Sequence, residues 1–136
     1  MTREEHFYSL HGELIKFYQI IENDIKWIYS FMLEGNPNKT RMNVSNYTLG
    51  QILNELKRLD NSDDNPCISP ADYKFLNKMT DKRNYWCHQC YIDFVYEDNC
   101  FKSKEFNTVY DKLIKDYSQA SQVVQNVQEL KLKLRR

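Results

Sequence analysis

Apolar residues between positions 4 and 33 recur at alternating steps of three and four, and this spacing constrains the fold more than any other feature of the sequence. One face of a helix has this period, so the segment predicts an amphipathic helix of about eight turns. We expect it to end at Gly35-Asn36-Pro37, a common helix stop, and to be followed by a polar loop. The stripe consists of Phe7, Leu10, Leu14, Phe17, Ile21, Ile25, Ile28 and Met32.

Three further helices follow from start signals and apolar spacing. Residues 48–51, TLGQ, have the form of a capping box and predict a second helix. Ser69 followed by Pro70 supplies an N-cap and a first helical residue, and we expect this third helix to run to about Glu97. Ser103 is placed to cap a last long helix. The stripe of that helix contains Phe106, Tyr110, Leu113, Tyr117, Ala120, Val124 and Val127.

Glycine and proline are scarce. The 136 residues contain only three of each, and no glycine follows Gly50, so the chain lacks material for the turns of an all-β fold. A chain of this length also fits one hydrophobic core. We therefore predict an all-α, up-and-down bundle of four to five helices that forms a single domain over residues 1–136.

Charge and cysteine usage narrow the class of protein. Lysine plus arginine equals aspartate plus glutamate, 19 against 19, which argues against coating nucleic acid by bulk charge, so any RNA contact must be local. The four cysteines are few and irregularly spaced, which favours a reducing cytoplasm. The first ten residues do not have the pattern of a signal peptide, and no run of about 18 apolar residues could span a membrane. We expect a cytoplasmic protein without a membrane partner.

Read as one helix, residues 70–97 carry apolar side chains on two opposite sides. A helix of this kind must be covered on both sides. A symmetric homodimer would supply the second cover, and the alternative is another helix of the same chain. The first side contains Phe75, Leu76, Met79, Trp86, Cys90 and Phe94, and the second contains His88, Tyr91, Ile92 and Val95.

The segment RNYWCHQCY, residues 83–91, contains two kinds of chemistry. Cys87 and Cys90 form a C-x-x-C pair, but in the middle of a helix, with no strand before it, they lack the usual setting of a redox site. A structural zinc site needs four ligands, and the cysteines at 67 and 100 lie beyond the two ends of this helix. Cys90 also belongs to the core stripe. We therefore expect no metal and no other cofactor.

The second chemistry is proton and phosphate transfer by Arg83 and His88. Histidine exchanges protons near neutral pH, and the planar arginine fork donates two parallel hydrogen bonds to phosphate oxygens. Asn84 lies one turn before His88 on the same face and could orient the imidazole or bind phosphate. Arg83 and His88 are about 140° apart around the helix, so the arginine must reach around it or meet the histidine across a dimer seam.

The six residues RNYWCH, Arg83 to His88, resemble the R-x(4–6)-H motif of the HEPN superfamily, the higher eukaryotes and prokaryotes nucleotide-binding domains, in which asparagine often follows the arginine. The late helix that carries the motif and the upstream TLGQILNEL, residues 48–56, are also similar to small bacterial members. The resemblance implies an up-and-down bundle and dimerisation that brings two motifs into one cleft. It also implies metal-independent endoribonuclease activity in toxin–antitoxin or phage-defence systems.

By this resemblance Arg83 would bind or polarise the scissile phosphate, His88 would act as general acid or base, and Asn84 would be a polar accessory. Some toxins of the family carry H-x-Y, with a tyrosine that a partner nucleotidyltransferase modifies. Here Tyr91 stands one position later, in H-x-x-Y, so it is an auxiliary candidate, and a nucleotidyltransferase or other antitoxin is a possible partner.

Lys78 and Lys82 lie near the motif and are candidates for contacts with RNA phosphates, although isolated surface lysines are usually only solvated. Two other functions stay open. The chain could be a non-catalytic HEPN module in which Arg83 and His88 bind a nucleotide or a partner protein. It could also be a purely structural helical adaptor.

Overall fold

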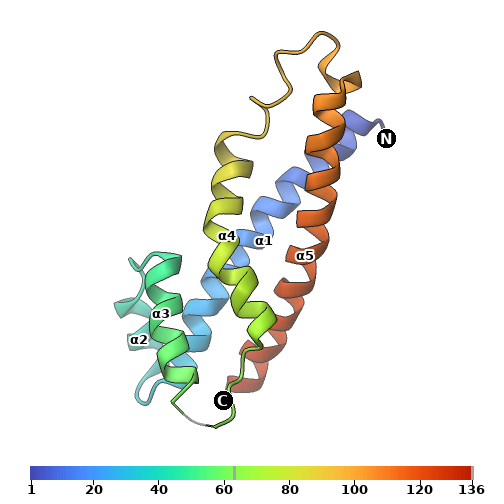
Figure 1. The fold of residues 1–136 in the computed structure, drawn as a ribbon. Helices are drawn as coiled ribbons and strands as arrows, with labels where there is room; N and C mark the ends of the chain where they lie inside the picture. The colour runs from blue at the N-terminus through green and yellow to red at the C-terminus, as the bar shows by residue number, and fades with distance from the viewer. Residues whose placement is uncertain (63, 136) are drawn as a thin grey trace.

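The computed structural model describes residues 1–62 and 64–135, and in these residues the chain is helical and contains no strand (Figure 1). The all-α prediction is therefore confirmed, with five α-helices in the described residues. The helices are α1 (Arg3–Met32), α2 (Pro37–Asn43), α3 (Leu49–Asp60), α4 (Pro70–His88) and α5 (Lys104–Leu134), with the short 3-10 helix η1 (Cys100–Lys102) before α5.

Side-chain caps begin the helices where the sequence predicts them. In α3 the Gln51 backbone N–H donates to the Thr48 hydroxyl at 3.2 Å, and the Thr48 N–H donates to the Gln51 side chain at 2.9 Å, so the capping box is complete. The Ser69 hydroxyl accepts from the Asp72 N–H at the start of α4, and Ser103 caps α5 in the same way. These starts are confirmed.

The two long helices, α1 and α5, run parallel to each other. Arg3 at the start of α1 donates to Asn107 at the start of α5 at 2.6 Å. Near the other end of the pair, Lys131 of α5 donates to Asp24 of α1 at 2.8 Å. Figure 1 shows both helices descending from the same end of the molecule. The pair forms the frame against which the shorter helices pack.

Helix α4 runs antiparallel to this pair. The Trp86 indole, near the end of α4, donates to Asp116 in the middle of α5 at 2.8 Å. Asp72, near the start of α4, accepts from Asn126 in the last third of α5 at 3.4 Å. Helix α3 lies beside α4 and α1 at the lower end of Figure 1. The bundle thus carries the end of α4 toward the end of the molecule where α1 begins.

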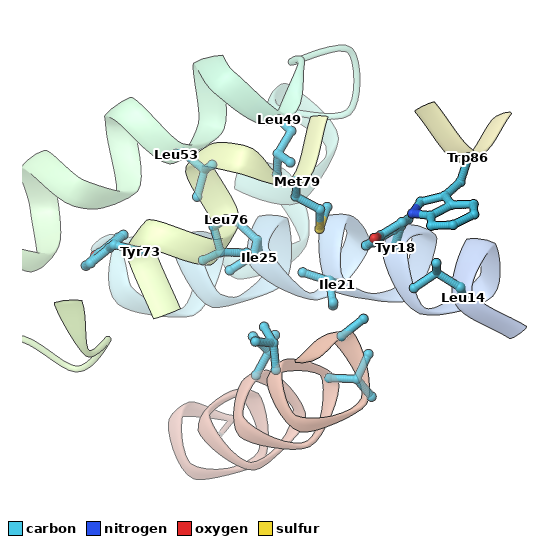
Figure 2. Close-up of a cluster of buried hydrophobic side chains, with 14 of the residues drawn as sticks. Leu14, Tyr18, Ile21, Ile25, Leu49, Leu53, Tyr73, Leu76, Met79 and Trp86 are labelled. Carbon is cyan, nitrogen blue, oxygen red and sulfur yellow. The ribbon is translucent and has the colours of Figure 1, made fainter. Parts of the chain in front are cut away.

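The hydrophobic core lies where these helices face one another (Figure 2). Ile25 of α1 lies beside Leu76 of α4, and Ile21 points toward the side chains of α5 that close the cluster from the other side. Most of the predicted stripe positions of α1 and α5 are buried, and the others are partly buried. Tyr18 lies outside the predicted stripe of α1 and is also fully buried.

The segment after α1 differs from the prediction of a polar loop. Gly35 has a φ of 120°, a conformation that favours glycine, and it turns the chain after α1. The Asn36 side chain then accepts from the backbone N–H groups of Asn38 and Lys39, and Pro37 is the first residue of α2. Asparagine as N-cap and proline at the first position start a helix as efficiently as Ser69-Pro70 does. The segment Gly35-Asn36-Pro37, predicted to end the first helix, therefore also starts the next one.

Helix α4 ends at His88, so the prediction that it runs to about Glu97 is wrong. The Nε2–H of His11, on α1, donates to the Trp86 carbonyl at 2.7 Å. In a continued helix this carbonyl would accept from the Cys90 N–H. The Cys90 N–H bonds instead to the Tyr85 carbonyl at 3.0 Å. Residues 89–99 continue as a series of turns.

The early helix end also corrects the prediction of a second apolar helix face. Cys90 and Phe94 remain buried, because the turns after α4 still place every fourth residue against the core. Ile92 and Val95 are exposed, and Tyr96 is 85% exposed. The apolar side chains beyond the core therefore lie on a turn segment at the end of α4.

None of the helices in the described residues is both long enough and apolar enough to cross a membrane.

We predict that His11→Ala lowers the free energy of unfolding by about 1–2 kcal/mol, because the Trp86 carbonyl loses its N–H donor and keeps only the weak Cys90 thiol as a partner. Urea denaturation measures the change. His11→Gln, which keeps an N–H donor, is the matched control and should recover at least half of the loss. Equal stability of the two variants would show that the hydrogen bond does not fix the end of α4.

Candidate functional site

The last two turns of α4 place Arg83 and His88 in different environments. Arg83 is partly buried, and its Nη1 donates to Oε2 of Glu22 on α1 at 2.8 Å. His88 is the last residue of α4, and Asn84 precedes it by one turn on the same face. Both side chains are exposed, and neither makes a side-chain hydrogen bond within residues 1–62 and 64–135. The arginine thus turns toward the bundle and the histidine toward solvent, as their spacing predicts.

The Arg83–Glu22 ion pair leaves part of the guanidinium available. A guanidinium has five N–H donors, and the contact with Glu22 uses those of Nη1 only. Because both side chains are partly exposed, the pair contributes no more than about 1 kcal/mol. A phosphate could therefore bind the remaining donors or displace Glu22. The carboxylate also lowers the net positive charge that Arg83 presents to an anion.

His88 offers an imidazole that both solvent and a ligand can reach. Neither ring nitrogen is occupied by a hydrogen bond within the described part of the chain, so both can exchange protons with a bound molecule. The Asn84 amide supplies one acceptor and two donors beside it. Exposed polar groups of this kind contribute little to stability. Their arrangement suits contact with a ligand.

Tyr91 does not share a helix face with His88, because α4 ends between them. Its ring packs edge-on against Phe7 at 5.6 Å and His11 at 5.3 Å. Burial raises the pKa of the Tyr91 hydroxyl to about 12, so the hydroxyl stays protonated at neutral pH. The ring is part of the aromatic cluster at the start of α1.

The two lysines near the motif differ. Lys82 donates to Asp116 at 3.3 Å and to Gln119 at 3.0 Å, both on α5. Asp116 is only 4% exposed and also accepts from the Trp86 indole, so Lys82 neutralises a buried carboxylate between two helices. Lys78 is exposed and has no ion pair within the described residues. Of the two, Lys78 is the one free to meet a phosphate.

The C-x-x-C pair lies across the end of α4, not in the middle of a helix as predicted. Cys87 is exposed and Cys90 is buried. Burial raises the pKa of the Cys90 thiol to about 11, which makes it a poor nucleophile and a poor metal ligand at neutral pH. The described residues hold no group of three or more histidine, cysteine or acidic side chains that could bind a metal ion.

Three residues that position the motif were not predicted: Glu22, His11 and Asp116. Asp116 had a signal, because it lies three residues after Leu113 and four before Ala120, on the apolar stripe of α5. A carboxylate at such a position needs a buried partner. Glu22 and His11 occupy boundary positions of α1, where the sequence shows nothing unusual.

The chain was compared with protein-family models, with curated proteins and with solved structures, and none of them matches it.

We predict that Glu22→Gln tightens the binding of a phosphodiester chain by about three- to tenfold, because it removes the carboxylate that competes for Arg83. A 2′-O-methyl oligoribonucleotide, which lacks the attacking hydroxyl, serves as the probe in fluorescence anisotropy.

Glu34→Gln is the matched control for Glu22→Gln. It makes the same change in charge at an exposed residue just beyond the end of α1 and should leave the affinity within about twofold of wild type. If both variants bind equally well, Glu22 does not restrain Arg83.

Proposed function

We propose that this chain is a metal-independent endoribonuclease of the HEPN type that acts in the cytoplasm as part of a toxin–antitoxin or phage-defence system. The observation that supports the proposal is the end of α4, where an exposed, unpaired His88 follows Asn84 by one turn. Arg83, on the same two turns, has guanidinium donors that Glu22 does not use. The chemistry needs only these groups and the substrate.

In this mechanism the 2′-hydroxyl of the RNA attacks the adjacent phosphorus, and the bond to the 5′-oxygen breaks. One imidazole accepts the proton of the 2′-hydroxyl, and an imidazolium donates a proton to the departing 5′-oxygen. Arg83 stabilises the extra negative charge on the phosphate oxygens, and Asn84 orients the imidazole or binds an oxygen. The products are a 2′,3′-cyclic phosphate and a 5′-hydroxyl.

The two proton transfers favour a homodimer. A single His88 cannot be unprotonated and protonated in the same step, whereas two copies facing each other supply both forms. Exposed apolar side chains for such an interface stand directly after the motif, at Ile92, Val95 and Tyr96. A twofold axis near this segment would bring the two motifs together. The RNA substrate would then lie between the subunits, and an antitoxin could act by covering this cleft.

One observation favours a second function, a non-catalytic HEPN module that binds a nucleotide or a partner protein. Arg83 is already paired with Glu22, as expected of an arginine that stabilises the bundle or anchors an interface. This module would bind phosphate at the same residues and would leave RNA intact.

We predict that the protein cleaves RNA in the presence of EDTA and that His88→Ala reduces the rate by about 10²- to 10⁴-fold. The stability of this variant should stay within about 0.5 kcal/mol of wild type, because His88 is exposed and unpaired. Arg83→Lys keeps the charge without the planar fork and should retain only part of the activity. Cleavage that needs added metal, or that survives both His88→Ala and Arg83→Ala, would refute the mechanism.

We predict that Tyr96→Glu shifts the protein from dimer to monomer and reduces RNA cleavage with it, because it adds charge to an exposed apolar segment beside the motif. Sedimentation velocity measures the change in oligomeric state. Leu132→Glu, at another exposed apolar position near the end of α5, is the control and should remain dimeric and active. A wild-type protein that is a monomer yet cleaves RNA would exclude the shared cleft.

A further inference from the structure

A second polar and aromatic site lies at the opposite end of α1 from the contact between His11 and α4. Trp27 is 16 residues beyond His11 on the same helix, about 24 Å away along the axis. Here the end of α1, the start of α2 and the end of α5 meet at the lower end of the bundle (Figure 1). They border an open pocket of about 520 Å³ lined by Trp27, Phe31, Pro37, Asn38, Lys131 and Arg135.

One wall of this pocket is aromatic. Trp27 and Phe31 are stacked, with ring centroids 5.5 Å apart and an angle of 27° between the ring planes. The Arg41 guanidinium lies 5.8 Å from the Trp27 ring and donates to Asn23 at 2.9 Å, which holds it beside the indole. Both rings are only partly buried. Because nucleobases stack on such rings whatever their sequence, the wall suits a flat aromatic ligand.

The other wall is cationic. Arg135 is exposed and has no ion pair within the described residues. Lys131 donates to Oδ1 of Asp24 at 2.8 Å, and this bond fixes its ammonium group at the pocket while two N–H donors remain. Asp24 offsets part of the Lys131 charge, so Arg135 supplies most of the net positive charge beside the stacking surface. This combination suits a ligand that joins an aromatic ring to a phosphate.

Asp24 is the buried partner of Lys131. It is only 2% exposed, and its second oxygen, Oδ2, is buried without a hydrogen-bond partner in the described residues. Asp24 does not itself line the pocket, and its role there is to hold the Lys131 ammonium group in place.

We propose that this pocket binds a nucleotide, whose base extends the stack of Trp27 and Phe31 and whose phosphate contacts Lys131 and Arg135. The volume lies within the range of small-molecule sites in proteins. The same chemistry is presented by a free nucleotide and by one unpaired residue of a single-stranded RNA. The site is separate from Arg83 and His88 and does not depend on their catalytic role.

Titration of the full chain with AMP tests the proposal, with calorimetry for the affinity and tryptophan fluorescence for the location. The chain has two tryptophans, and Trp86 is buried in the core, so quenching by a stacked base reports on Trp27. We expect AMP to quench the emission of wild type and not that of Trp27→Phe. Adenosine and inorganic phosphate should each bind more weakly than AMP. Tighter binding of AMP than of oligoadenylate identifies a free nucleotide as the ligand, and the reverse identifies RNA.

Arg135→Glu and Lys133→Glu form a matched pair, since both reverse one exposed charge at the end of α5 and only Arg135 lines the pocket. We expect Arg135→Glu to weaken AMP binding at least fivefold and Lys133→Glu less than twofold. His88→Ala should bind AMP as wild type does, which separates this site from the proposed nuclease centre. Absence of quenching at millimolar AMP, equal losses in the two charge variants, or equal affinity for AMP and phosphate would overturn the proposal.

Discussion

Trp86 joins the three main helices of the bundle, and the position of the candidate site depends on it. Its carbonyl accepts a hydrogen bond from His11 of α1, and its indole N–H donates to Asp116 of α5. The first contact ends α4 two residues later, and the second joins the end of α4 to the middle of α5. Lys82 neutralises the same buried carboxylate, so one motif-flanking residue is part of the scaffold. Buried polar groups that are fully paired make such an arrangement rigid, because breaking any one bond leaves a partner without solvation.

This scaffold divides the residues of the motif by role. Arg83 turns toward α1, where Glu22 pairs with it, whereas Asn84 and His88 project into solvent. Within one chain the guanidinium and the imidazole are therefore held apart, and joint action on one phosphate requires either displacement of Glu22 or a second subunit. The exposed apolar side chains at 92, 95 and 96 follow His88 in the chain and favour the second solution. The same ion pair also supports the alternative of a binding module. The two functions differ in whether the Glu22 carboxylate is displaced from Arg83 or stays paired with it.

The two ends of the bundle carry different chemistry. The end that holds the motif combines a titratable imidazole with an aromatic cluster around Phe7 and Tyr91. The other end combines stacked rings, two cations and a buried carboxylate with one unpaired oxygen. A rigid bundle with α1 extending between both ends holds these groups at a fixed separation.

The sequence by itself determined the helical class, the starts of α3, α4 and α5, most of the buried face of α1 and α5, and the opposite directions of Arg83 and His88. These features follow from local capping bonds and from the helical period, which neighbouring residues encode. Only the tertiary structure decided where α4 ends, since His11, which donates to the Trp86 carbonyl, lies 75 positions earlier in the chain. It also decided that Glu22 pairs with Arg83 and that Lys82 pairs with Asp116. Such pairings depend on which helix faces meet, and no short stretch of sequence contains that information.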